Sequence, residues 1–167
     1  PYLCGHATIG ALMTLAKTGF LILDEGENLI PVDTPSGVMH GRLTISGGQP
    51  TCVAIDMVPS FVYATDREIE VENFGRIKVD LVCTGGFFAM VDATQLEIEP
   101  VLANKDLLAD LGMKIIRAGN EQLSVSHPLR PEVKSIDVTE FYDSKYEQGR
   151  VFGQGVIVYG ESHVDRS

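Results

Sequence analysis

The first ten residues of the chain read PYLCGHATIG, and they place a cysteine and a glycine at the start of a predicted helix. The apolar residues that follow recur at helical spacing, at Ile9, Leu12, Met13 and Ala16. Gly19 is placed to be the left-handed residue that ends the helix. The pattern therefore predicts a helix that begins beside Cys4 and ends before Gly19.

Cys4 has two interpretations at this position. A helix N-terminus leaves backbone N–H groups without partners and carries the positive end of the helix dipole. Such a position favours the thiolate form of a cysteine and can also hold a carboxylate. One short segment would then supply both a base and an anion-binding site. The alternative is a structural cysteine, since most free cysteines are small buried apolar residues.

The composition narrows the class of protein. The 167 residues are 44% hydrophobic and 22% charged, which is typical of a globular chain of one domain or two small lobes. A formal charge of −10 argues against nucleic acid or an anionic membrane as a general partner, because both require a basic surface. Three cysteines, an odd number, suit free thiols in a reducing cytoplasm. No signal peptide or membrane-spanning run is visible, and both ends look cut from a longer chain.

The first part of the chain alternates short apolar runs with turn signals. Strands are predicted at Phe20–Leu23, Val38–Ile45 and Thr51–Val58, with a turn at Asp24–Asn28. Pro59-Ser60 interrupts the last run. We therefore expect a lobe boundary near residue 60.

The second part contains the clearest local pattern, a β-hairpin. Apolar and charged residues alternate over residues 68–72 and 76–81, on either side of the turn Asn73-Phe74-Gly75. The pattern sets glutamates opposite Arg76 and Lys78, a favourable cross-strand pairing.

The remaining elements are a buried strand, a helix and two more strands. They are predicted at Phe87–Val91, Asn104–Ala118 with Gly119 beyond its end, Ser135–Phe141 and Val156–Tyr159. Residues 142–155 read as a polar loop, and residues 164–167 as a stretch with no terminal element. Two helices among about eight strands, without strict βαβ alternation, predict an α+β fold.

Metal and nucleotide sites are not predicted. Cys4 and His6 are two residues apart, but no second ligand pair follows, and His40, His127 and His163 are scattered singly. No phosphate-binding loop or dinucleotide fingerprint is present. Acid–base work by Cys4 beside an anion-binding helix end is the remaining local hypothesis.

The segment Leu3-Cys4-Gly5-His6-Ala7-Thr8-Ile9-Gly10 resembles the first active-site motif of the proline racemase family, which usually has Gly where this chain has Ala7. Further segments resemble the family in the same order: VPSF at 58–61, GGFFAMVD at 85–92, LGMKI at 111–115, Asn120-Glu121, His127-Pro128, EFY at 140–142 and VDRS at 164–167. The resemblance extends along the whole chain.

The resemblance implies a fold like that of diaminopimelate epimerase, with two lobes that each wrap a curved sheet around a central helix. Residues 1–60 would be part of the first lobe and residues 61–167 part of the second. It implies no cofactor, and two catalytic groups on opposite sides of the substrate α-carbon. Cys4 matches the first catalytic thiol, Gly5 and His6 match positions that hold the substrate carboxylate, and Asp165 matches an acid that contacts the substrate amine.

The second motif of the family places its catalytic residue two positions beyond Ser167, and that residue distinguishes the reactions. A cysteine there goes with racemases and epimerases, and a threonine with trans-3-hydroxyproline dehydratases. Cys52 and Cys83 do not match the motif and are expected to be buried strand cysteines. We expect a cytoplasmic, cofactor-independent proline racemase that acts on a small-molecule substrate, and the family suggests a homodimer. The alternatives are a 4-hydroxyproline epimerase, the dehydratase, and an inactive fragment or binding module.

Overall fold

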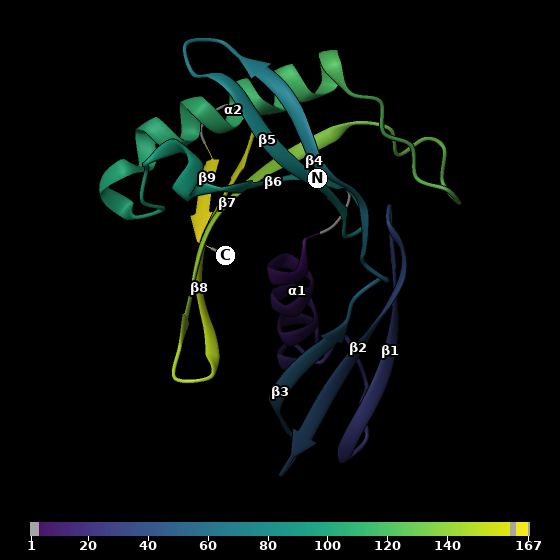
Figure 1. Cartoon of the computed structure of the whole chain (residues 1–167). Helices are drawn as coiled ribbons and strands as arrows, with labels where there is room; N and C mark the ends of the chain where they lie inside the picture. Colours follow the sequence, from purple (N-terminus) through teal and green to yellow (C-terminus); the bar gives the residue numbers. More distant parts are fainter. Residues whose placement is uncertain (1–3, 161–162, 167) are drawn as a thin grey trace. The chain divides into compact units, whose positions relative to one another are not determined.

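The computed structural model describes residues 4–160 and 163–166. These residues form two compact units, one of residues 4–59 and one that begins at residue 60. Figure 1 draws the first unit in purple to blue and the second in teal to yellow. Each unit has its own helix and its own sheet, so the predicted α+β class is confirmed.

The smaller unit packs one helix on a three-stranded antiparallel sheet (Figure 1). Its elements are α1 (Gly5–Lys17), β1 (Gly26–Thr34), β2 (Gly37–Ser46) and β3 (Gln49–Asp56), with the strand order β1-β2-β3. Every second residue of β2 is buried, and the buried apolar side chains are Met39, Leu43 and Ile45. Gly41 shares their face, and a Cβ there would collide with Leu12 of α1. The glycine therefore lets the helix approach this strand closely, and a larger residue there would force the Leu12 side chain to move.

Helix α1 ends as the sequence predicts. Gly19 has a φ of 72°, its N–H donates to the Ala16 carbonyl at 3.1 Å, and the Phe20 N–H donates to the Leu15 carbonyl at 2.9 Å. This pair of hydrogen bonds is the Schellman arrangement of a glycine-terminated helix.

The predicted strand at Phe20–Leu23 is wrong. These residues form a bend after α1, and the side chains of Phe20 and Ile22 are 81% and 98% exposed. The first strand is instead β1, which starts at Gly26 inside the predicted turn at Asp24–Asn28. The apolar residues do not form a strand because the start of this segment is held by the hydrogen bonds that end α1. One of them runs from the Leu21 N–H to the Leu15 carbonyl.

The larger unit has a six-stranded sheet with the order β4-β5-β6-β7-β8-β9. The strands are β4 (Phe61–Val71), β5 (Gly75–Cys83), β6 (Phe87–Asp92), β7 (Ile136–Glu147), β8 (Arg150–Tyr159) and β9 (His163–Arg166). Strands β6 and β7 are parallel, and the other neighbours are antiparallel. Two short 3₁₀ helices, Ala93–Leu96 and Leu102–Asn104, precede α2 (Lys105–Gln122) in the connection from β6 to β7.

Helix α2 covers one face of this sheet and closes its core (Figure 1). The side chains of Leu108, Leu111 and Ile115 are fully buried, together with Phe87 of β6 and Phe141 of β7. These three helical residues lie at the spacing of one helix face. The core of the larger unit therefore lies between α2 and the middle of the sheet.

The predicted hairpin at residues 68–81 is confirmed as β4 and β5. Its register places Glu68 opposite Lys78 and Glu70 opposite Arg76, as expected. The Arg76 Nη1 lies 3.5 Å from the Glu68 Oε2 across the diagonal. Because both side chains are well exposed, this ion pair contributes little to stability.

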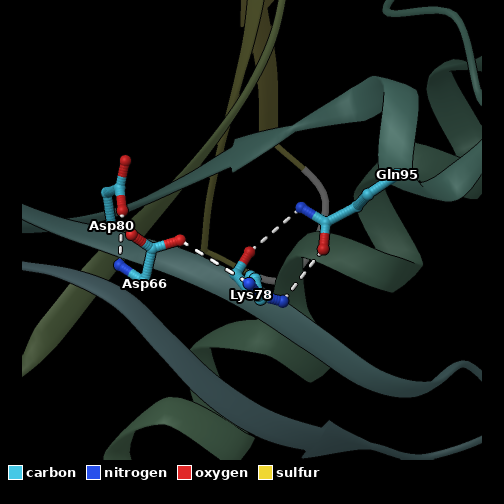
Figure 2. Close-up of polar contacts among 4 residues, drawn as sticks. All are labelled: Asp66, Lys78, Asp80 and Gln95. Atoms are coloured by element: carbon cyan, nitrogen blue, oxygen red, sulfur yellow. Dashed lines mark hydrogen bonds and ion pairs between the residues drawn. The ribbon is translucent and has the colours of Figure 1, made fainter.

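Side-chain amides complete the backbone hydrogen bonding where strands run out of partners. Figure 2 shows Gln95, whose Oε1 accepts from the Lys78 N–H at 2.9 Å and whose Nε2 donates to the Lys78 carbonyl at 3.0 Å. Gln122 makes the same pair of bonds with Glu70 of β4, both at 2.8 Å. Asn120 does so with Ile136 of β7, again at 2.8 Å for both.

Strand β4 is interrupted by a bulge near Asp66, which has a φ of 53°. The Asp66 N–H donates to the Asp80 Oδ1 at 2.8 Å, and the Asp66 Oδ1 lies 3.8 Å from the Lys78 Nζ (Figure 2). A non-glycine residue with positive φ costs free energy, so these contacts hold the bulge in place.

Three expectations for the larger unit are wrong. Gly119 does not end α2, which continues to Gln122, because Gly119 does not adopt the positive φ of a helix-ending glycine; it lies instead against the Ile136 Cδ1. Residues 142–155 are not a loop: β7 and β8 extend through them as a hairpin, closed by Gln148 and Gly149 with φ of 50° and 77°. The stretch 164–167 was expected to carry no element; Ser167 lies outside the described residues, and residues 163–166 form β9 and pair with β8.

Candidate functional site

The N-terminus of α1 holds three of the four predicted site residues. Cys4 is the N-cap, with extended backbone angles (φ −138°, ψ 103°), and its carbonyl accepts bonds from the Thr8 N–H at 3.1 Å and the Thr8 Oγ1 at 2.9 Å. Among the described residues the Cys4 side chain makes no capping hydrogen bond, and the residue is exposed. Cys4 is therefore not buried in this chain, and its catalytic role stays a prediction.

Gly5 and His6 are the first two residues of α1. Gly5 lies against the end of β3, where an added Cβ would be 3.3 Å from the Ile55 Cδ1 and 3.7 Å from the Met57 Sδ. His6 is exposed. Helix geometry leaves the first N–H groups without intrahelical acceptors, and the first turn carries no acidic residue. The end of α1 thus offers N–H donors and a positive dipole end beside an exposed thiol.

Asp165 is an exposed residue of β9, in the register position opposite Ile157 of β8. It belongs to the larger unit, whereas Cys4, Gly5 and His6 belong to the smaller one. The structure therefore brings three of the predicted residues together, and it describes the fourth on a separate unit.

The other two cysteines differ from each other. Cys83 of β5 is fully buried, as expected. Cys52 is exposed on β3, opposite Thr44, so the expectation of a buried Cys52 is wrong. An exposed Cys52 makes it a suitable comparison for Cys4.

The scattered histidines do not form a ligand set. In the part of the chain that the structure describes, no three His, Cys, Asp or Glu side chains gather as a metal site would require. The His163 ring stacks on Tyr159 with centroids 5.5 Å apart, and His127 is nearly buried beside Phe61.

Two titratable groups to which the sequence analysis assigned no role have shifted pKa values. Burial lowers the pKa of His127, and the nearby Arg130 charge lowers it further. Burial also raises the pKa of Tyr142, and Asp92, Asp80 and Asp66 raise it further. Both residues lie in the short segments quoted above for the resemblance, which was the only signal in the sequence for either.

A shallow hollow of about 190 Å³ lies on the β7–β8 hairpin. Its lining residues are Asp143, Lys145, Glu147, Phe152, Gly153 and Gln154. None of the predicted site residues contributes to it. Neither α1 nor α2, within the residues described, is both long and apolar enough to cross a membrane.

Comparison with known proteins extends these observations. The family model described as proline racemase matches residues 1–167. A proline racemase of Clostridioides difficile is 33% identical over 99% of this chain, and the match covers 49% of that protein. A 4-hydroxyproline 2-epimerase of Streptosporangium roseum is 32% identical over 83% of this chain and 42% of its own length. A trans-3-hydroxy-L-proline dehydratase of Colwellia psychrerythraea is 28% identical over 99% of this chain and 46% of its own length.

The fold of this chain is similar to the folds of solved structures of the same family. The hydroxyproline epimerase of Agrobacterium vitis, with bound trans-4-hydroxy-L-proline, matches with a TM-score of 0.81 and 29% identity, over 96% of this chain and 46% of that one. The probable proline racemase of Agrobacterium radiobacter matches with a TM-score of 0.78 and 28% identity, over 92% of this chain and 45% of that one. The chain spans about half the length of these relatives. By the family match over all 167 residues, the chain belongs to the proline racemase family.

Proposed function

We propose that this chain carries one half of the active site of a cofactor-independent amino-acid racemase or epimerase, with Cys4 as one of its two acid–base groups. The observation that carries the proposal is the exposed thiol of Cys4 at the N-cap of α1, in a chain that matches the proline racemase family throughout.

The chemistry follows from what the end of α1 offers. The α-proton of an amino acid is weakly acidic, so its removal requires donors that stabilise the charge developing on the carboxylate. The N–H groups of Gly5 and His6, at the positive end of the helix, are proposed to be these donors. Cys4 as a thiolate takes the α-proton, and the second group returns a proton to the opposite face, which inverts the configuration.

Asp165 is proposed to pair with the substrate ammonium group. A carboxylate accepts charge-assisted hydrogen bonds from a secondary ammonium such as that of proline. This role requires the two units to present Cys4 and Asp165 to one substrate molecule. No organic cofactor or metal ion is needed, because protein groups perform both proton transfers. A homodimer stays a prediction.

Proline is the leading substrate, and its hydroxylated forms are the alternatives. Proline racemases of Clostridioides difficile and Acetoanaerobium sticklandii are 33% and 31% identical to nearly the whole chain. The structure with bound trans-4-hydroxy-L-proline supports the epimerase alternative, and the dehydratase of Colwellia psychrerythraea supports elimination from trans-3-hydroxy-L-proline.

The deciding experiment is proton NMR in deuterated water with L-proline, trans-4-hydroxy-L-proline and trans-3-hydroxy-L-proline in turn. Loss of the α-proton signal with appearance of the other stereoisomer identifies a racemase or epimerase and its substrate. Loss with an elimination product identifies the dehydratase. If a folded chain, and any longer form that carries it, leaves all three substrates unchanged, the proposal of a proline or hydroxyproline substrate is wrong, and either a substrate outside the proline series or a binding or structural role replaces it.

Cys4→Ser tests the assignment of the thiol, with Cys52→Ser as the matched control on a second exposed cysteine. Loss of a general acid–base group lowers the rate by about 10²–10⁴-fold, and we expect that loss for Cys4→Ser alone. Both variants should keep the wild-type circular dichroism and melting temperature. Wild-type exchange by Cys4→Ser would overturn the assignment.

A further inference from the structure

The segment from His127 to Val133 is a tight turn in which the histidine ring is a structural partner. The His127 N–H donates to the Val133 carbonyl at 2.9 Å, and the Arg130 N–H donates to the His127 carbonyl at 3.2 Å. The Val133 side chain is fully buried, which anchors the far end of the turn. His127 itself is only 9% exposed.

Both ring nitrogens of His127 face nitrogen donors of the same turn. The Leu129 N–H points at Nδ1, with 3.2 Å between the nitrogens, and the Arg130 Nη2 lies 3.1 Å from Nε2. A neutral imidazole has one nitrogen that accepts and one that donates. It can therefore accept from only one of these two donors at a time.

A protonated imidazole can accept from neither donor. Both of its nitrogens carry hydrogen, so each would point at the nitrogen donor that faces it and could accept no hydrogen bond from it. The guanidinium of Arg130 adds like-charge repulsion at 3.1 Å. Hydrogen-bond geometry therefore favours neutral His127, which can accept one of these two bonds, over the charged form, which can accept neither.

The surroundings of His127 add little that would offset this conflict. The charged groups that act on it, among the described residues, are Arg130 and Glu132, and of these only Glu132 favours protonation. From β4, the neighbouring group is the uncharged ring of Phe61, in an edge-to-face contact with centroids 5.5 Å apart.

Phe61 gives the turn a role beyond its own loop. It is the first residue of β4 and follows the point, after residue 59, where the chain passes from one compact unit to the other. The His127 ring therefore packs on the residue by which the chain enters the larger unit.

We propose that the turn at residues 127–133 is a pH-sensitive clamp on the start of β4, closed when His127 is neutral and released when it is protonated. Acidification opens the Leu129 and Arg130 contacts and withdraws the ring from Phe61. The clamp is independent of the chemistry proposed for Cys4, and it gives the start of β4 a built-in response to pH.

The test is NMR of the 167-residue chain from about pH 4 to pH 8, following the His127 ring, the Leu129 amide and the Phe61 ring together. We expect His127 to titrate below 6.5, the ordinary value for histidine, and the other two signals to shift with the same midpoint. An ordinary or raised midpoint, or Leu129 and Phe61 signals that do not follow His127, would overturn the proposal. Because the wild-type chain gives this readout, the result does not depend on a variant that folds.

Two charge-removing variants separate the clamp from general electrostatics. Arg130→Gln removes the cation in contact with Nε2 and should raise the His127 midpoint toward 6.5. Lys134→Gln removes an exposed cation of the same segment and should leave the midpoint within experimental error. Equal shifts in both variants, or no shift in Arg130→Gln, would refute a specific contact.

Discussion

Replacing Gly112 by alanine is the sharpest test of how α2 packs on the sheet. A Cβ at Gly112 would lie 2.6, 2.8 and 2.9 Å from the Cβ, Cγ1 and Cγ2 of Val158 on β8, whereas carbon atoms pack best at about 3.5–4.0 Å. Neither side can yield easily, because the Val158 atoms are fixed to a buried strand and Thr139 Oγ1 donates to the Gly112 carbonyl at 2.9 Å.

The expected magnitude is a difference of two opposing terms. Overpacking of a close-packed core costs about 1–3 kcal/mol, and three close contacts with a rigid β-branched side chain favour the upper part of that range. The higher helix propensity of alanine offsets about 1 kcal/mol. Gly112→Ala should therefore lower the free energy of unfolding of the larger unit by about 1–2 kcal/mol.

Urea denaturation followed by circular dichroism measures this loss, and Gly119→Ala in the same helix is the control. A Cβ at Gly119 would meet only the Ile136 Cδ1, at 2.8 Å, and that atom is the movable end of a side chain. Its clash and its gain in helix propensity should nearly cancel. The two variants share chemistry and helix, so their difference isolates the rigidity of Val158.

A double-mutant cycle with Val158→Ala completes the test. That change removes two of the three atoms that a Cβ at Gly112 would meet. The loss of unfolding free energy in the double variant should therefore be smaller than the sum of the losses in the two single variants, by about 0.5 kcal/mol or more. Additive losses, or a Gly112→Ala chain as stable as the wild type, would refute the packing described here.

Three further predictions concern other contacts. Asn120→Ala leaves the Ile136 N–H and carbonyl without their partners, and urea denaturation should show a loss of about 1–3 kcal/mol; a loss below 0.5 kcal/mol would contradict this. The pKa of Tyr142 in the folded chain should lie above its ordinary value of 10.0, so the unfolded chain loses the phenol proton at a lower pH than the folded chain does. The free energy of unfolding should therefore fall as the pH rises above 10.0. Tyr142→Phe should remove the contribution of this group to the loss of stability measured in alkaline denaturation. The Gly47 and Gly48 N–H groups donate to the Glu25 carboxylate at 2.7 and 3.1 Å, and Glu25→Gln should weaken both hydrogen bonds. Amide hydrogen exchange at Gly47 and Gly48 should then be faster than in the wild type, and unchanged exchange would disprove this.

The elements that sequence analysis located correctly are those with a complete local signal. The β4–β5 hairpin has alternation on both sides of a compact turn, and its cross-strand pairs follow from that alternation alone. The end of α1 needs only Gly19, whose positive φ terminates the helix. The same helix boundary places Cys4 at the N-cap, so this part of the candidate site was predictable.

The elements that were missed depend on partners far away in the sequence. Gly119 looks like a helix stop, yet it serves the contact with Ile136, which lies in a strand that begins after the helix. The β7–β8 hairpin beyond Tyr142 is largely exposed on both faces, and its apolar residues Tyr146, Val151 and Phe152 do not alternate with polar ones in a way that identifies strands. The strand that carries Asp165 is four residues long, and its pairing with β8 defines it.

The hydrogen bonds from a side-chain amide to the backbone of an edge strand affect whether the protein aggregates in a crowded solution. Strand β4 is the outer strand at one end of the six-stranded sheet, and such an edge can template the addition of a strand from another molecule. At Glu70 both outward-facing backbone groups are occupied by Gln122, and near Asp66 the bulge bends the strand away from a regular ladder. A second chain would therefore find the row of donors and acceptors along β4 interrupted at Glu70 and near Asp66, which disfavours strand addition at this edge of the sheet.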